Sequence, residues 1–225
     1  MNQQPTAIIN QIYRLGRPNG PPLTICAAAK GQSLDKVCTV VKLGVSQIGE
    51  NYVQEAQQKY DNDEWRALKA ERRLKLRLIG HLQSNKVKQA INIFDSVDTV
   101  HSAKLAVKLN RFWAKAEPLE VLMQYNPLAE ATKEGLVNYR QLLDLAQLIN
   151  DLNNLQLKGL MVIAPNRPDL AAATFKLVYQ AYSDLKLAGF KLDTLSMGMS
   201  GDYEPAIAAG STMVRLGTAL FGSRL

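Results

Sequence analysis

Short apolar segments alternate with amphipathic segments of helical period along the whole chain. A short apolar run suits a buried strand, and the helical segments between such runs would cover the sheet. Strands that alternate with helices predict a parallel sheet, because each return to the same edge needs a crossover connection. We predict eight strands, over residues 23–29, 45–49, 74–80, 93–97, 118–126, 155–163, 193–199 and 212–217.

The helical segments fall before and between these strands. One precedes the first strand, within residues 7–16, and others are predicted over 34–44, 139–150 and 170–189. Gly44 stands where a glycine cap would end the second of these helices. Near the end of the chain, Pro205 suits the first turn of a short helix that Gly210 would end.

Eight strands in one chain favour closure into a single (β/α)8 TIM barrel of the α/β class, with an additional N-terminal helix. Such barrels typically run to about 250 residues, so residues 1–225 are expected to form one domain with no second domain. The alternative is an open doubly wound sheet, which would want a glycine-rich turn after the first strand. Residues 30–35, KGQSLD, do not supply that turn.

The net charge of +7 at pH 7 raises the question of a nucleic-acid partner. The densest basic segment is KAERRLKLR, residues 69–77, and neither a recognition motif nor interleaved aromatic residues accompany it. We interpret it as a solvated helix end that leads into a strand, and expect no nucleic-acid binding.

The expected compartment is the cytoplasm. No basic segment followed by an apolar segment begins the chain, so no signal peptide is predicted, and no apolar run approaches the length of a membrane span. The two cysteines, Cys26 and Cys38, do not form a disulfide framework, which indicates a reducing environment.

Polar residues gather where the predicted strands end, which in a barrel is the face that carries the active site. They are Lys30, Glu50, Asn51, His81, Asp98, Asn126, Ser200, Gly201, Arg215, Gly217 and Thr218. For Asp98 and Asn126 we favour a role in capping turns or helices. The two histidines, His81 and His101, lack the spacing of a metal motif, so no metal site is expected.

Lys30 follows the apolar run LTICAAA directly. A surface lysine that extends its amine to solvent is the ordinary interpretation of such a residue. At the catalytic face of a barrel, however, a desolvated amine can form a Schiff base with a carbonyl substrate or with pyridoxal 5'-phosphate (PLP).

The segment 197–222 contains the other candidate site. The loops after the seventh and eighth strands are the usual phosphate site of this fold, and here they carry Ser200 and Gly201, and Gly217 and Thr218. Ordinary turn and capping chemistry would explain the same residues. Arg215 lies inside the last strand, where an inward-pointing guanidinium would need a partner such as a pyridine nitrogen.

Four segments resemble the pyridoxal phosphate homeostasis protein family, which is similar to the barrel domain of alanine racemase. They are AAAK (27–30), GENYVQEA (49–56), IGHLQSNK (79–86) and DTLSMGMSGDYEPAIAAGSTMVRLGTALFG (193–222). The resemblance extends from about residue 6 to residue 224. Many members follow the lysine with Thr-Lys-Pro, whereas Gly31, Gln32 and Ser33 stand here.

The resemblance implies a site for each part of the cofactor. Lys30 would carry PLP as an internal aldimine and Asn51 would lie against the ring, with Ser84 and Asn85 near the pocket. Arg215 would face the pyridine nitrogen. The phosphate would be held by Ser200, Gly201, Gly217 and Thr218.

The resemblance also implies a role in vitamin B6 homeostasis and in amino-acid and keto-acid balance. In alanine racemase the second base is a tyrosine from a further domain, and this chain ends at Leu225, after the last strand and its helix. We therefore expect a PLP carrier with no catalytic residue and little or no racemase activity. Its partners would be PLP and PLP-dependent apoenzymes, and a monomer is expected.

Two other classes remain open from the residues. One is an enzyme, either a small racemase or a Schiff-base aldolase. An aldolase would need a carboxylate or tyrosine near Lys30, for which Glu50 is the candidate, although its place before Asn51 also suits helix capping. The other is a regulatory interaction protein for which PLP is a signal.

Overall fold

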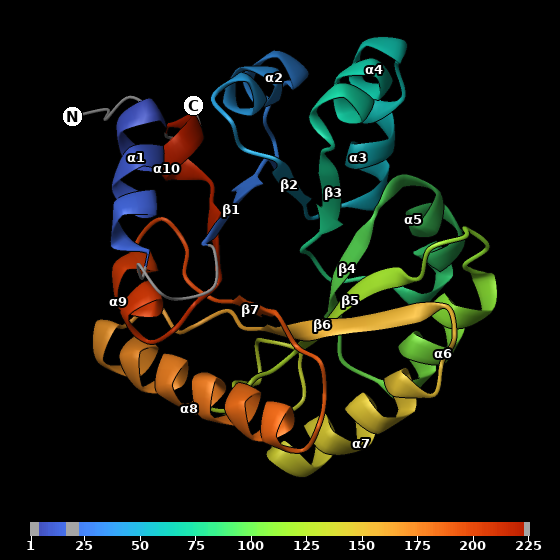
Figure 1. Cartoon of the computed structure of the whole chain (residues 1–225), viewed down its shortest axis with the longest axis vertical. Helices are drawn as coiled ribbons and strands as arrows, with labels where there is room; N and C mark the ends of the chain where they lie inside the picture. Colours follow the sequence, from blue (N-terminus) through green and yellow to red (C-terminus); the bar gives the residue numbers. More distant parts are fainter. Residues whose placement is uncertain (1–4, 17–22, 223–225) are drawn as a thin grey trace.

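A computed structural model describes residues 5–16 and 23–222, and in it eight parallel strands close into a barrel (Figure 1). Each strand pairs with the next one in sequence, and the last pairs with the first, so that Thr24 lies opposite Met213. The strands are β1 (Thr24–Ala28), β2 (Gln47–Glu50), β3 (Lys75–Leu78), β4 (Ser96–Val100), β5 (Leu119–Gln124), β6 (Leu155–Met161), β7 (Thr194–Ser196) and β8 (Met213–Leu216). The predicted TIM barrel is confirmed.

Helices surround the barrel and follow the strands in order (Figure 1). The additional N-terminal helix α1 (Pro5–Leu15) is present and packs beside the final helix α10 (Thr218–Phe221). The others are α2 (Leu34–Lys42), α3 (Val53–Tyr60), α4 (Asp63–Arg72), the short 3₁₀ helix η1 (Ser84–Lys86), α5 (Val87–Ile93), α6 (Ala103–Phe112), α7 (Tyr139–Asn150), α8 (Pro168–Leu187) and α9 (Tyr203–Ala208). None of the helices in the described part is long and apolar enough to span a membrane.

The glycines and the proline that were predicted to end or begin helices lie at helix ends in the structure. Gly44 takes φ +97° after α2, a left-handed conformation that glycine adopts without a steric cost. Pro205 lies in the first turn of α9, and Gly210 follows that helix at φ +105°. These glycines and the proline therefore fix where the helices α2 and α9 end or begin.

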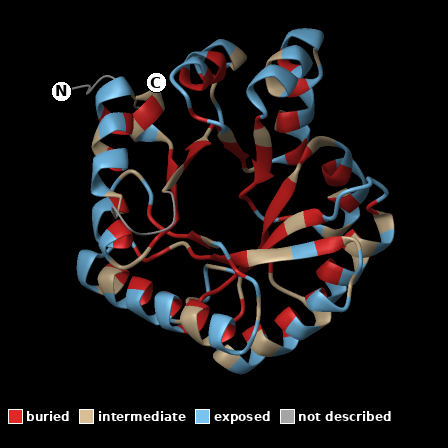
Figure 2. Ribbon diagram, viewed as in Figure 1, coloured by how far each residue is buried: buried red, intermediate tan, exposed pale blue. Residues whose placement is uncertain are grey.

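Side chains alternate along each strand between the outer and the inner face of the barrel. On β1, Ile25 and Ala27 join the large apolar core that the helices cover, whereas Cys26 packs with Ile79 and Met213 in a small separate cluster. Figure 2 shows the result, with most of the strand residues in the ring buried, β6 in part excepted, and helices buried on the side that faces the ring. The same alternation decides which polar side chains enter the barrel.

The barrel interior holds an ion pair between Arg77 on β3 and Asp98 on β4. The guanidinium donates from Nε and Nη2 to the two carboxylate oxygens at 2.9 and 2.8 Å, and both side chains are at most 4% exposed. Ser96 Oγ donates to the same carboxylate at 2.6 Å, and Arg77 Nη1 donates to Gln47 Oε1 at 3.2 Å. Burial lowers the pKa of Arg77, but the Asp98 carboxylate outweighs burial and raises it overall.

The observed bounds of β4 correct two expectations. The predicted strand 93–97 begins too early, because Ile93 still belongs to α5, and β4 runs from Ser96 to Val100. Asp98 therefore lies inside a strand and caps nothing. The basic segment 69–77 runs from the exposed end of α4 into β3, as predicted, and Arg77 in its strand part is buried because its position on β3 points it into the barrel.

Candidate functional site

A cavity of about 340 Å³ opens at the carboxyl ends of the strands. Its walls come from the ends of β1, β2, β3 and β6 and from the loops after β7 and β8. The lining residues are Ala28, Lys30, Asn51, Ile79, Ile163, Met199, Ser200, Gly201, Arg215, Gly217 and Thr218. Every predicted cofactor residue except Ser84 and Asn85 is among them.

Lys30 reaches the cavity because of its place in the alternation of β1. Cys26 and Ala28 face the interior of the barrel, and Lys30 continues this series just beyond the strand. Its side chain is half-buried, and Nζ lies 4.9 Å from the centroid of the Tyr52 ring. The amine therefore lies at the mouth of the barrel, where a carbonyl compound in the cavity can meet it.

The backbone on both sides of Lys30 is held by two charged side chains of α3. Lys59 Nζ donates to the carbonyl oxygen of Ala29 at 2.9 Å, and Gly31 N–H donates to Glu55 Oε1 at 2.6 Å. Lys59 and Glu55 are themselves paired at 3.0 Å. Burial raises the pKa of Glu55, but the Gly31 N–H and Lys59 stabilise the carboxylate and the net pKa lies below its usual value.

Glu50 takes no part in the cavity. It lies on the outer face of β2, fully buried, where its Oε1 is bound by Lys59 at 2.7 Å and by the Tyr60 hydroxyl at 2.6 Å. Burial raises the pKa of this carboxyl, against the opposing effect of Lys59 and Tyr60. Glu50 therefore neither caps a helix nor lies beside Lys30 in the cavity, and the proton shuttle that an aldolase would need is not supplied by it.

Arg215 forms the inner wall of the cavity and is 4% exposed. Nη1 donates to the carbonyl oxygen and hydroxyl of Ser196 at 2.9 and 2.7 Å, and Nη2 donates to the carbonyl oxygen of Val162 at 2.7 Å. Burial lowers the pKa of this guanidinium. Within the described part of the chain Nε has no hydrogen-bond partner and Nη2 has one, so Nε–H and the second N–H of Nη2 remain for a ligand.

The loops after β7 and β8 meet through Ser200. Its hydroxyl oxygen accepts hydrogen bonds from the backbone N–H groups of Gly217 and Ala219, each at 3.2 Å. Thr218 begins α10 with an exposed side chain. Ser200 and Thr218 line the cavity together with Lys30, and their hydroxyl groups are able to donate hydrogen bonds to an anionic group.

Ser84 and Asn85 do not line the cavity. They form η1 together with Lys86, and their side chains are half-buried and exposed, respectively. Conversely, sequence reasoning missed the apolar wall formed by Ala28, Ile79, Ile163 and Met199. Only the alternation along β1 and β3 could have indicated Ala28 and Ile79, since apolar residues at strand ends carry no signal of their own.

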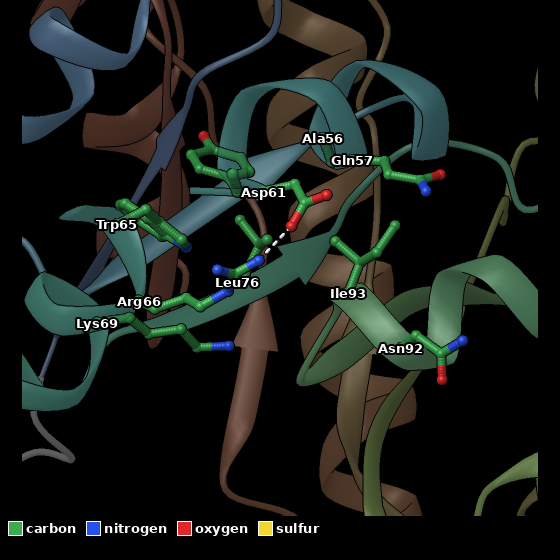
Figure 3. A pocket seen from close by; sticks show the side chains of 10 residues that line it. Ala56, Gln57, Asp61, Trp65, Arg66, Lys69, Leu76, Asn92 and Ile93 are labelled. Carbon is green, nitrogen blue, oxygen red and sulfur yellow. Dashed lines mark hydrogen bonds and ion pairs between the residues drawn. The ribbon is translucent and has the colours of Figure 1, made fainter. Parts of the chain in front are cut away.

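A second hollow, of about 330 Å³, lies outside the barrel between α3, α4, β3 and α5 (Figure 3). Its polar lining is dominated by Arg66, which pairs with Asp61, and by Lys69. None of the predicted cofactor residues contributes to it. The amine of Lys69 lies outside the barrel, and the loops after β7 and β8 do not border this hollow. The cavity around Lys30 has both an amine at the mouth of the barrel and these two loops, so it is the better candidate.

The chain is similar to known proteins over most of its length. Residues 23–225 match the family model described as alanine racemase, N-terminal domain. The pyridoxal phosphate homeostasis protein of Vibrio cholerae serotype O1 is 40% identical over 205 residues, which cover 89% of this chain and 85% of that protein. The protein of the same name from Escherichia coli K12 is 38% identical over 206 residues, which cover 90% of this chain and 86% of that protein.

Solved structures include PipY of Synechococcus elongatus PCC7942, which is 29% identical to this chain. Its structures without PLP and with PLP bound superpose with TM-scores of 0.82 and 0.80, and each comparison covers 97% of this chain and 100% of that chain. The similarity to these proteins in sequence and in barrel structure thus extends over nearly the whole length of the chain. The chain belongs to the pyridoxal phosphate homeostasis protein family, within the wider group described as the alanine racemase N-terminal domain.

Proposed function

We propose that this protein binds PLP in the cavity at the carboxyl end of the barrel, as a Schiff base with Lys30, and thereby contributes to vitamin B6 homeostasis. The observation that carries the proposal is the grouping of Lys30, Arg215, Ser200 and Thr218 around one cavity. The names of the curated relatives and the PLP bound to PipY support it.

The residues present fit the chemistry of this cofactor. PLP supplies an aldehyde, a pyridine ring and a phosphate dianion. Lys30 would bind the aldehyde carbon, Arg215 would donate from Nε to the pyridine nitrogen, and Asn51 would lie beside the ring. Ser200 and Thr218 would donate their hydroxyl protons to the phosphate, and Gly217 would allow the backbone to approach it.

A carrier role follows from what surrounds the amine. Among the described residues that line the cavity, Lys30 is the one side chain able to act as a base, and the Tyr52 ring near its amine does not belong to that lining. A guanidinium at the pyridine nitrogen also keeps that nitrogen unprotonated, which weakens the ring as an electron sink. We therefore infer a protein that holds PLP, delivers it to PLP-dependent apoenzymes and has little or no racemase activity.

The same proposal includes the setting of the protein. Both cysteines, Cys26 and Cys38, are free and buried, which supports a reducing compartment, and we propose the cytoplasm. We further propose a monomer that binds no nucleic acid. Ser84 and Asn85 stay predicted neighbours of the cofactor, to be tested by substitution.

The proposal is tested by adding PLP to the cofactor-free protein and recording the absorption spectrum. A visible band that saturates at one PLP per chain is expected, because a Schiff base absorbs differently from the free aldehyde. The loaded protein should then racemise L-alanine far more slowly than the ~10 s⁻¹ that is typical of enzymes. A spectrum equal to that of free PLP would contradict the binding site, and rapid racemisation would contradict the carrier role alone.

Thr218→Ala is expected to weaken PLP binding while the visible band keeps its position. A hydrogen bond to a charged group contributes about 1.5–3 kcal/mol, so the dissociation constant should rise about ten- to a hundredfold. Titration with PLP, followed by absorbance, measures it. Thr218→Ser retains the hydroxyl and should bind nearly as the parent does; equal affinity of the alanine variant and the parent would remove Thr218 from the phosphate site.

A further inference from the structure

The loops that follow β3, β4 and β5 bring together three side chains that the cofactor site does not use. They are His81, His101 and Glu134, and their potential ligand atoms all lie within 4.8 Å of one another. His81 Nδ1 is paired with Glu134 Oε2, and His101 Nε2 lies 3.7 Å from the same oxygen. The two imidazole rings are 5.5 Å apart between centroids.

The position and tautomer of His101 are fixed by the end of β4. Its Nδ1 lies 3.0 Å from the carbonyl oxygen of Thr99. Because a carbonyl oxygen only accepts hydrogen bonds, Nδ1 donates to it, and Nε2 is the ring nitrogen that remains for Glu134 or for a metal ion. Metal-binding histidines are oriented by such a hydrogen bond from the other ring nitrogen. Thr99 Oγ1 donates to the carbonyl oxygen of Gly80 at 2.9 Å and so ties β4 to the residue before His81.

Glu134 is held in place by amides at the end of β5. Gln124 Nε2 donates to the backbone carbonyl oxygen of Glu134 itself at 2.8 Å. Asn126 Nδ2 donates to the carbonyl oxygen of the preceding residue, Lys133, at 2.9 Å. Both amides are at most 7% exposed, so the loop that presents the carboxylate is anchored to the barrel. The three side chains themselves remain accessible, with exposed fractions of 44%, 24% and 50%.

We propose that His81, His101 and Glu134 bind a divalent transition metal ion, with Zn²⁺ as the best fit. Two imidazoles and a carboxylate are a common set of three protein ligands to zinc, and imidazole nitrogens discriminate against Mg²⁺ and Ca²⁺. Ligand atoms around a tetrahedral zinc ion lie roughly 3.3–3.6 Å apart. Side-chain rotations that move the ligand atoms of this cluster by about 1 Å would bring them to such separations. A fourth position stays open for water or an anionic ligand.

The proposed metal site borders the candidate cofactor cavity. Ile79 lines that cavity, and His81 follows two residues later. Between them, Gly80 packs so closely on Asn51 that a Cβ atom there would lie 2.3 Å from the Asn51 carbonyl oxygen. The metal ion would therefore share the carboxyl face of the barrel with the cofactor without using any of the residues proposed to hold it.

The test uses the untagged protein, treated with EDTA and dialysed into PLP-free buffer. The chain contains only two histidines, and both cysteines are buried, so binding through imidazole can come from this site alone. Calorimetric titration with ZnCl₂ should give one ion per chain. In parallel, Zn²⁺ should shift the NMR resonances of both imidazole rings, which requires no variant.

Substitution then identifies the ligands. His81→Gln, His101→Gln and Glu134→Gln should each lower the affinity for Zn²⁺ by more than the roughly 10–100-fold that loss of an outer-shell partner costs. Glu130→Gln is the matched control, because Glu130 is in the same loop but pairs with Lys133 outside the cluster, and its affinity should equal that of the parent. Circular dichroism confirms folding.

Two results would overturn the proposal. One is the absence of heat and of any imidazole shift when Zn²⁺ is added to the parent protein, which would leave the cluster as an ion pair between histidine and glutamate. The other is undiminished Zn²⁺ binding in the folded His81→Gln, His101→Gln double variant, which would place the metal elsewhere on the chain.

Discussion

Replacing Lys30 with arginine is expected to abolish the visible band of the PLP-loaded protein completely. A guanidinium keeps the positive charge and much of the side-chain volume, but it cannot form the Schiff base that a primary amine forms. In the parent, borohydride should reduce that bond and leave PLP attached irreversibly to Lys30. Peptide mapping by mass spectrometry after reduction gives the measurement.

Lys36→Arg is the matched control for this substitution. Lys36 lies on α2, six residues further along the chain, where its amine reaches Gln32 and does not line the cavity. Its replacement should leave the band, the stoichiometry and the modified peptide unchanged. If the Lys30→Arg protein still gives the parent spectrum, or if PLP is found on another lysine after reduction, the assignment of the cofactor amine is wrong.

Asp98→Ala is expected to lower the free energy of unfolding by about 3–5 kcal/mol. Removal of the carboxylate leaves the Arg77 guanidinium buried inside the barrel without its counter-charge, and it also removes the acceptor of the Ser96 hydroxyl. Denaturant unfolding monitored by circular dichroism gives the free energy. This loss is a large fraction of the total stability of an ordinary domain.

Two variants separate the ion pair from the loss of a side chain. Asp144→Ala removes a carboxylate that pairs with Arg140 on the exposed face of α7, and it should change stability by no more than about 1 kcal/mol. The double variant Arg77→Met, Asp98→Leu removes both charges and should recover much of the stability. If Asp98→Ala costs no more than Asp144→Ala, the buried pair contributes little and the barrel interior tolerates the free guanidinium.

The strand–helix alternation was sufficient to predict the barrel, because each of the eight predicted strands overlaps an observed one. The same pattern predicted most of the cavity. Lys30 and Asn51 follow the first two strands and Arg215 lies in the last one, and only the rule that parallel strands end at one face brings them together. Ser84 and Asn85 rested on the family resemblance alone, and they fall outside the cavity in η1.

Other features could not be predicted, because they depend on register. The fourth strand lies a few residues later than predicted, so Asp98, which was predicted to cap a turn or helix, lies inside the strand. There it is the buried partner of Arg77. Lys59 looks like an ordinary polar residue of a helix, yet it is 9% exposed and holds the strand end before Lys30. His81 and His101 have no local motif, and only the neighbouring ends of β3 and β4 bring them together with Glu134.

The hydrogen bonds from Lys59 to Ala29 and from Gly31 to Glu55 have a thermodynamic consequence for cofactor exchange. The backbone around Lys30 has already lost its conformational entropy when the chain folds, so a ligand need not order it. What remains to be ordered is the lysine side chain, whose rotamer entropy is worth at most about 2 kcal/mol. In the proposed site, a preorganised strand end with one flexible amine would let the phosphate and ring contacts set the affinity for the cofactor, and would let the cofactor leave without local unfolding of the barrel.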